Sequence, residues 1–299
     1  MRNFVLALVI VLGTLAASGL SCGEAPQAGT GTLALYLSDA PIDAENVTGV
    51  YITINEIQYH VDDQWMTCGE FEGPQTYNLL ELTNGNSTLL GELTLPGGHY
   101  NQIRFMLDIP EMGQDPYNPG CYIKFADNST SPLFVPSGTT TGYKGVGQFT
   151  VASNGTVQVT ADFDVRKAVH LADSHYILHP TIRLVVNDEA GRISGSIANN
   201  STYTDIIVFA YADGTWADTE DDEPVSPASR FPNSVNSGKM CEDGHYTIPL
   251  LAAGTYDLVV AGYNSDVFGE VLGFVSDVVV QNKKTTKQDI DTGTLELSL

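Results

Sequence analysis

Apolar and polar residues alternate with a period of two along much of this chain, which predicts β-strands. Residues 33–38 (LALYLS) and 50–55 (VYITIN) each place aliphatic side chains on one face and polar or aromatic side chains on the other. The SDAP sequence at residues 38–41 predicts the end of the first strand. Pro41 has no N–H for a ladder hydrogen bond, and the Asp39 carboxylate can bond to its own backbone. No helical period intervenes, so the mature chain begins as β structure.

The same alternation recurs through the first half of the chain, and turn residues separate the repeats. The clearest case places Val157, Val159 and Ala161 on one face and Asp162 and Asp164 on the other. A short helix is predicted at 168–174. The further predicted strands are residues 77–82, 87–95, 102–108, 121–126, 147–151, 156–165 and 181–186. This spacing is typical of a β-sandwich.

A second domain follows a predicted hinge at 187–191. The stretch GHYTIPLLAAGTYDLVVAGY at 244–263 predicts a hairpin that turns at Gly254. Other predicted strands are residues 192–197, 206–211, 275–280 and 295–299. The expected fold is therefore all-β, with two β-sandwich domains in tandem at 32–187 and 191–299.

The N-terminus has the layout of a secretory signal peptide over residues 1–21: an early arginine, an apolar run and then small residues. The sequence GLSC that ends at Cys22 resembles a bacterial lipobox, in which the cysteine is lipidated and becomes the first mature residue. Residues 22–31 would then form a tether. The alternative is ordinary cleavage after Ser18, which leaves Cys22 as a spare thiol. Lipidation implies an exported protein anchored to the cell envelope, at the outer membrane or cell surface.

Five motifs of the first half occur in a fixed order. They are SDAP (38–41), YNLLEL (77–82), LTLPGGHYNQIR (93–104), DFDVRK (162–167) and HPTIR (179–183). As a set they resemble a domain of unknown function found in exported prokaryotic lipoproteins. The resemblance covers most of residues 30–187 and implies the location and the fold, but no activity.

The hairpin at 244–263 contains a G-x-Y strand, a glycine turn and a G-x-Y-x-L strand. Residues 192–299 thereby resemble the carboxypeptidase regulatory-like (prealbumin-like) β-sandwich. A long acidic loop at 213–241 departs from that pattern. Such domains usually act as spacers or stabilisers, and some relatives bind starch or other glycans.

The chain is strongly acidic, with 36 aspartates and glutamates against 13 lysines and arginines, for a net charge of −23. Phosphate backbones and anionic lipids repel such a surface, which argues against a nucleic-acid partner and against membrane docking through a basic patch. Calcium is a chemically suitable counterion.

Three cysteines remain after Cys22, and in an oxidising compartment an odd number leaves one unpaired. Cys68 and Cys121 both lie in Gly- and Pro-containing loops of the first half, so they are the expected disulfide, with Cys241 free. If Cys22 is not lipidated, a Cys22–Cys241 pair becomes possible.

The acidic loop concentrates carboxylates around Trp216, namely Asp213, Asp218, Asp221 and Asp222. Calcium binds six to eight oxygen ligands, which a flexible acidic loop can supply, although no EF-hand spacing occurs. The alternative interpretation is a solvated charged loop.

Aromatic residues on outward strand faces and in loops can stack on sugar rings. Tyr36, Tyr51 and Trp216 are the candidate ligand-binding residues, with Trp65, Tyr117 and Tyr122 as further members of the set. The alternative is cross-strand packing of the aromatic side chains.

Few groups of residues in this sequence have the types and spacing of a catalytic or metal-binding site. Asp162 and Asp164 share a strand face and suit paired acid–base work, but Arg166 shares that face and favours an ion network. The histidines at 170, 175 and 179 lack the carboxylate spacing of a metal triad. No G-x-S-x-G elbow, P-loop or HExxH motif occurs, so we expect a non-enzymatic protein.

These patterns together predict an envelope-anchored lipoprotein that acts as a binding or structural module. Its expected partners are the membrane, through the N-terminal lipid, and a polysaccharide or an envelope protein. The alternative is a secreted or surface glycan-binding module that depends on calcium, and a hydrolase using Asp162 and Asp164 is the third hypothesis.

Overall fold

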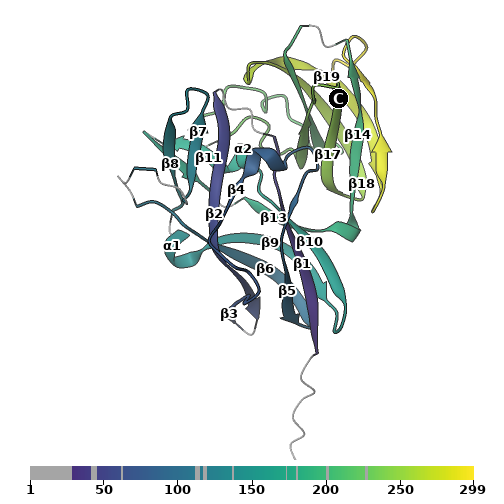
Figure 1. Cartoon of the computed structure of the whole chain (residues 1–299). Coiled ribbons are helices and arrows are strands. Elements are labelled where there is room, and N and C mark those ends of the chain that lie inside the picture. Colours follow the sequence, from purple (N-terminus) through teal and green to yellow (C-terminus); the bar gives the residue numbers. More distant parts are fainter. Residues whose placement is uncertain are drawn as a thin grey trace, which may run out of the picture.

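The computed structural model describes residues 29–41, 46–61, 63–111, 115–116, 120–136, 138–172, 174–179, 181–199, 202–225 and 228–299. These residues are mostly β, as the alternation predicts (Figure 1). The strands are β1 (Thr30–Ser38), β2 (Val47–Val61), β3 (Gln64–Thr67), β4 (Gln75–Asn78), β5 (Thr88–Pro96), β6 (Gly98–Leu107), β7 (Tyr122–Phe125), β8 (Thr130–Phe134), β9 (Tyr143–Val151), β10 (Thr156–Asp162), β11 (Val169–Ala172), β12 (His175–Leu178), β13 (Ile182–Val186), β14 (Ala190–Ala198), β15 (Asp205–Ala212), β16 (Asn236–Lys239), β17 (His245–Ala252), β18 (Gly254–Asn264), β19 (Val267–Val280), β20 (Thr285–Lys287) and β21 (Ile290–Asp291). Short helices lie between them: α1 (Gly138–Thr141), α2 (Val165–Ala168) and the 3-10 helices η1 (Leu79–Leu82) and η2 (Asn187–Glu189).

The first domain is one strongly curved sheet that contains β1 to β13. Its main path runs β11-β12-β8-β7-β2-β6-β9-β13-β10-β1-β5, with β3 and β4 paired to β2. Both halves of the sheet contribute side chains to a single hydrophobic core. Leu33, Leu35 and Leu37 of β1 are fully buried there, as their shared strand face predicts. The curvature therefore gives the two-layered, sandwich-like packing that the strand spacing indicates.

The SDAP motif joins three segments of the first domain. The Ser38 hydroxyl donates to the carbonyl oxygens of Leu82 (3.1 Å) and Asn86 (3.0 Å), just after η1. The Asp39 Oδ1 atom accepts from the backbone N–H of Val165 at the start of α2 (2.9 Å). Both side chains are buried, so the motif ties the end of β1 to these two short helices.

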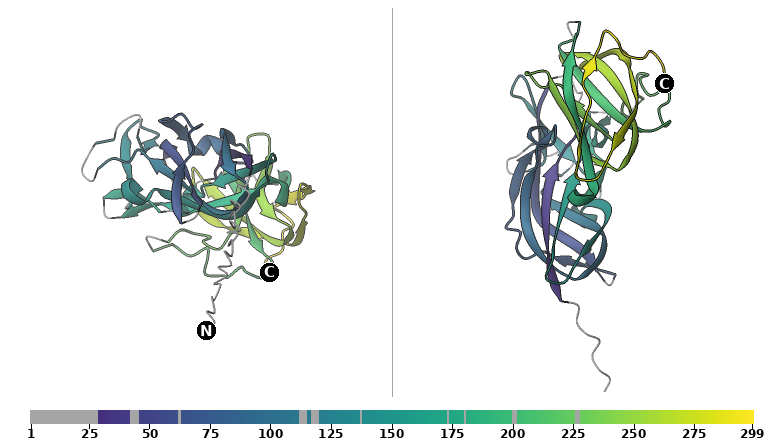
Figure 2. Two further views of the ribbon diagram at one scale, coloured as in Figure 1. Left: turned by 90° about the horizontal axis from the view of Figure 1, so that it is seen from below. Right: turned by 90° about the vertical axis from the view of Figure 1, so that its right-hand side faces the viewer.

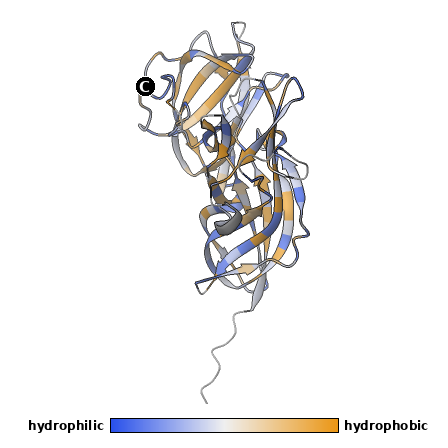
Figure 3. Ribbon diagram, turned by 90° about the vertical axis from the view of Figure 1, so that its left-hand side faces the viewer, coloured by the Kyte–Doolittle hydropathy of each residue, from blue (hydrophilic) through white to orange (hydrophobic). Residues whose placement is uncertain are grey.

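The second domain is a sandwich of two four-stranded sheets. One sheet contains β17, β14, β20 and β21, and the other has the order β16-β15-β18-β19. Apolar residues of both sheets meet in one core. The opposite face of β15 and β18 is also covered, because the loop at 213–235 packs Trp216 and Phe231 against it. Burial on both faces explains why β15 reads IIVFAY without alternation. Figure 3 shows the contrast: long apolar runs in this domain and alternating colours along strands of the first.

Several predicted elements differ from the structure. Residues 79–82 form η1 rather than a strand, since the Asn78 side chain accepts from the Leu80 N–H and begins a tight turn. The helix predicted at 168–174 lies earlier, as α2, and residues 169–172 are β11. The expected strand at 295–299 is reduced to a single bridge between Phe274 and Glu296.

Buried polar contacts join the two domains. The Asp162 Oδ2 atom accepts from the Asn236 Nδ2 group (3.2 Å), and the Arg166 guanidinium reaches the loop at 231–234. Figure 2 shows the domains end to end, with β1 starting at the end of the first domain that lies away from the second. Among the described residues, no helix is long and apolar enough to cross a membrane.

Candidate functional site

A groove lies in the first domain, where strands β9 and β13 separate. These two strands pair at two positions only, Ile182 with Gly145 and Arg183 with Val146. Beyond that point β9 pairs with β6, and β13 pairs with β10. The resulting groove has a volume of about 940 Å³. Its size falls within the range of small-molecule sites.

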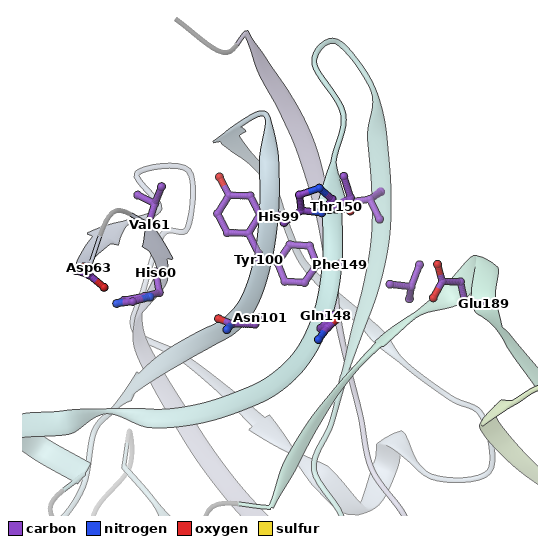
Figure 4. A pocket seen from close by; sticks show the side chains of 12 residues that line it. His60, Val61, Asp63, His99, Tyr100, Asn101, Gln148, Phe149, Thr150 and Glu189 are labelled. Atoms are coloured by element: carbon purple, nitrogen blue, oxygen red, sulfur yellow. Dashed lines mark hydrogen bonds between the residues drawn. The ribbon is translucent and has the colours of Figure 1, made fainter. Parts of the chain in front are cut away.

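The aromatic side chains of Tyr100 and Phe149 lie side by side in the groove (Figure 4). Their rings are stacked with centroids 5.3 Å apart, and the Tyr100 ring also packs edge-on against Tyr59. The Tyr100 hydroxyl donates to the carbonyl oxygen of Pro96 (2.7 Å). Both rings are almost fully buried, so they form a rigid apolar floor.

Polar side chains border this floor. Figure 4 shows His60, Asn101 and Gln148 in a row across β2, β6 and β9, with Glu189 at the far end. The register of β6 and β9 shifts between Tyr100 and Gln102, so Asn101 lies at a bulge. Bulges commonly redirect a side chain at functional sites. The groove thus presents amide and imidazole groups, which can both donate and accept hydrogen bonds.

The groove continues at its His60 end into an aromatic and cationic cluster. The His60 and Trp65 ring centroids are 5.0 Å apart. The Arg104 guanidinium carbon lies 4.3 Å from the Trp65 ring centroid, and the Lys144 Nζ atom lies 5.6 Å from it. Cation–π contacts of this kind hold an indole ring in place. Trp65, one of the aromatic candidates from the sequence, is therefore fixed beside the groove, on strand β3 rather than in a loop.

The predicted calcium loop does not gather its carboxylates. Among the described residues, no group of three or more His, Cys, Asp or Glu side chains can hold a metal ion. The Asp218 carboxylate accepts from the Trp216 indole N–H (3.2 Å), and Arg230 donates to the Asp221 carbonyl oxygen. Asp213 and Asp222 are not brought to either of them. Calcium binding at these four residues stays a prediction, and in this structure the loop packs on the sheet through Trp216 and Phe231.

Glu220, one of the acidic residues that crowd the loop around Trp216 in the sequence, organises this loop. Its carboxylate is buried and accepts from the Tyr211 hydroxyl (2.7 Å) and from the backbone and side-chain N–H groups of Asn233 (3.1 and 2.9 Å). Burial and this carboxylate raise the pKa of Tyr211. A glutamate between exposed acidic residues carries no sequence signal that distinguishes it.

The three candidate ligand-binding aromatics lie apart from the groove. Tyr51 stacks on Tyr122 of the neighbouring strand β7, with ring centroids 4.6 Å apart. Tyr36 is half-buried on β1 opposite Thr160 and Leu89. Trp216 packs edge-on against Tyr211, with ring centroids 5.2 Å apart. The structure does not bring them together.

The expected disulfide between Cys68 and Cys121 is not formed in the structure: both residues are buried free thiols, and Cys241 is an exposed one. Cys68 follows β3 and Cys121 precedes β7, and these strands pair with opposite sides of β2. A disulfide requires Cα atoms about 4.4–6.8 Å apart, which this arrangement prevents. Burial raises the pKa of each thiol to about 12. Cys22 lies outside the described residues.

Asp162 and Asp164, the candidate acid–base pair, both form ion pairs with cationic side chains. The Asp162 carboxylate forms an ion pair with Arg183 on the adjacent strand (2.7 Å), and the Asp164 carboxylate forms one with Lys167 (3.0 Å). This is the ion network that the sequence favours. Of the three histidines, the rings of His170 and His179 lie 5.1 Å apart, and burial lowers the pKa of His170.

Comparison with known proteins gives one family. A family model described as "Domain of unknown function (DUF4382)" matches residues 30–180. No curated protein matches this chain.

Solved structures match at low similarity. The Bacillus anthracis TIE protein is 12% identical, with 88% of this chain and 34% of that one covered, at a TM-score of 0.22. The minor pilin GBS52 of Streptococcus agalactiae is 12% identical over 88% of this chain and 95% of its own, at a TM-score of 0.20. The shaft pilin SpaA of Lactobacillus rhamnosus GG is 11% identical over 88% of this chain and 96% of its own, at a TM-score of 0.23. This chain thus spans about a third of the Bacillus protein. Similarity at these TM-scores supports no conclusion about function.

Proposed function

Because this chain belongs to the family described as a domain of unknown function (DUF4382), whose description assigns no activity, we propose a function from the groove itself. The protein is a non-enzymatic binding module that holds an uncharged oligosaccharide along the groove of the first domain.

The observation that carries this proposal is the row of amide and imidazole groups along a groove of about 940 Å³ (Figure 4). Oligosaccharides present hydroxyl groups that donate and accept, and the amide groups of Asn101 and Gln148 match that chemistry. The charged groups of the border are the carboxylates of Asp63 and Glu189, which disfavour an anionic ligand.

The absence of turnover is part of the proposal. The strongest catalytic candidates, Asp162 and Asp164, are paired with Arg183 and Lys167. Both residues are buried, so neither carboxylate is placed to contact the atoms of a ligand in the groove.

We also propose that the module is exported and lipid-anchored to the cell envelope through Cys22. In this arrangement the tether enters at the start of β1, so the second domain faces away from the membrane. The resemblance of the second domain to the carboxypeptidase regulatory-like sandwich suggests a spacer or stabilising role for it. A mature N-terminus at a diacylated or triacylated Cys22, found by mass spectrometry, is the expected result. A mature chain that begins at another residue would contradict the anchor.

The test of the groove is binding of the purified protein to an array of neutral and charged oligosaccharides, followed by calorimetry on the best neutral ligand. Replacing Asn101 and Gln148 together by alanine removes hydrogen-bonding groups from the groove without touching the buried floor. We expect a loss of affinity of about fivefold or more, since each lost hydrogen bond contributes about 0.5–1.5 kcal/mol. The matched control is Gln281→Ala, an exposed amide in the second domain.

The two variants separate the possible outcomes. Neutral ligands that bind equally well to the double variant would contradict the groove as the site. If no neutral oligosaccharide binds the wild-type protein, the glycan assignment itself is wrong. Release of reducing sugar during the assay would contradict the non-enzymatic assignment.

A further inference from the structure

A second hollow, of about 390 Å³, lies between the two domains. The turn η2 separates it from the groove: Glu189 lines the groove, whereas Asp188 lines this interdomain cleft. The first domain contributes Gln158 and Thr160 of β10, and the second contributes residues of β14, β17 and the turn before β20.

The charge of the cleft is opposite to that of the protein. The whole chain has a net charge of −23 and contains 13 lysines and arginines. Three of them, Arg192, Lys283 and Lys284, line the cleft with a single carboxylate, that of Asp188. A cationic hollow in a strongly acidic protein focuses field lines and attracts an anion.

Backbone hydrogen bonds hold these three cations together. The Lys283 N–H donates to the carbonyl oxygen of Ala190 (2.7 Å), and the Arg192 N–H donates to that of Lys284 (3.0 Å). Arg192 also lies opposite Thr285 in the parallel pairing of β14 and β20. The sheet therefore fixes the backbone of the three cationic residues side by side at the edge of the cleft.

Their charges are only partly neutralised within the protein. The Lys283 Nζ atom forms an ion pair with the Asp188 carboxylate (2.9 Å). Within the described part of the chain, the side chains of Arg192 and Lys284 form no hydrogen bond or ion pair. Neighbouring like charges repel one another, and a bound anion would relieve that repulsion.

We propose that this cleft binds the carboxylate group of an acidic oligosaccharide. Arg192 and Lys284 contact the carboxylate, and the amide of Gln158 with the hydroxyl of Thr285 contacts the sugar hydroxyls. The neutral polar lining distinguishes a sugar acid from a bare anion, which would leave these groups unused. The volume is at the small end for ligand sites, so the cleft accepts one end of such a chain. The inference does not depend on the groove.

The test is calorimetry of the purified protein with trigalacturonate and with its fully methyl-esterified form, which has the same sugars without the charges. We expect the acid to bind and the ester to bind at least tenfold more weakly. Raising the salt concentration should weaken binding of the acid, since exposed charges are screened. Inorganic phosphate is the third titrant, and the proposal expects it to bind more weakly than the acid.

Three variants locate the site. Arg192→Gln with Lys284→Gln should reduce affinity for the acid at least tenfold, whereas Lys124→Gln, a cation on β7 outside the cleft, should leave it unchanged. Asp188→Asn removes the internal carboxylate and should tighten binding severalfold, a gain that a merely damaged fold would not produce.

Equal affinity for acid and ester, no binding of the acid, tighter binding of phosphate, or an unaffected double variant would each overturn the proposal.

Discussion

The Arg166 guanidinium of the first domain donates a hydrogen bond from its NH1 group to the carbonyl oxygen of Phe231 in the second domain, at 3.2 Å. A second bond runs from its NH2 group to the Ser234 hydroxyl (2.9 Å), and the guanidinium carbon lies 5.1 Å from the Phe209 ring centroid. Arg166 is 4% exposed. One buried cation thus links α2, the acidic loop and β15 across the domain junction.

Replacing Arg166 by methionine should weaken this junction. The Arg230 carbonyl oxygen and the Ser234 hydroxyl would lose a buried donor, and the Asp164 carboxylate would lose a cationic neighbour, so we expect a loss of about 3 kcal/mol or more in the free energy of unfolding. Each domain has one tryptophan, Trp65 or Trp216, so fluorescence of Trp65→Phe and Trp216→Phe backgrounds reports each domain separately. Denaturant unfolding should be a single transition in the wild type and two in the variant. Coincident transitions in the variant would show that the junction does not depend on Arg166.

Glu220 and Glu223 lie in the same acidic loop and should differ sharply in their effect on stability. Glu220→Ala removes the buried acceptor of three hydrogen bonds and should cost about 1.5–3 kcal/mol in unfolding free energy. Glu223 is exposed, and among the described residues it pairs with Arg230 alone, so Glu223→Ala should cost less than about 1 kcal/mol. Urea unfolding and limited proteolysis of the loop measure the difference. Equal losses would mean that the loop is held by its net charge instead of by Glu220.

The thiols should differ in reactivity. Burial raises the pKa of Cys68 and Cys121 to about 12, so at pH 8 both remain protonated and enclosed. Cys241 is exposed, and we expect it to be the one of these three that a maleimide labels quickly in the folded protein. Peptide mass spectrometry before and after denaturation checks this. A disulfide-linked peptide containing Cys68 and Cys121 would contradict the arrangement of the strands around β2.

The buried Asp39 carboxyl should give the protein a measurable pH dependence. Burial raises its pKa well above the ordinary value of 3.8, with the charges of Asp164 and Asp162 adding to the effect. The folded state then keeps this proton to higher pH than the unfolded chain does. Its contribution to stability is therefore fully present below about pH 4 and is lost as pH rises through the raised pKa.

Asp39→Asn tests this dependence, because the amide keeps the acceptor for the Val165 N–H but cannot ionise. Relative to wild type, the variant should gain about 1 kcal/mol or more of unfolding free energy between pH 4 and pH 7. The exposed Asp243→Asn should run parallel to wild type over the same range. Parallel curves for Asp39→Asn would show that Asp39 ionises normally in the folded protein.

The sequence by itself determined the all-β class and most of the strands. Alternation along β1 and β2 is a local property of a few residues, so it is readable without knowing what each strand contacts. It failed where a local hydrogen bond competed with the strand, as at Asn78. The unbroken apolar run of β15 predicts a strand. It does not show that the loop that follows in the chain covers the second face of that strand.

Only the tertiary structure decided the sites. The groove depends on the separation of β9 from β13, and the cleft brings Arg192 next to Lys284, which lies far away in sequence. Arg166 and Phe231 are separated by 65 positions. Residue spacing carries no information about such contacts, because they follow from the order in which strands pair. The same reason explains why Cys68 and Cys121, which both lie in Gly- and Pro-containing loops, are on opposite sides of β2.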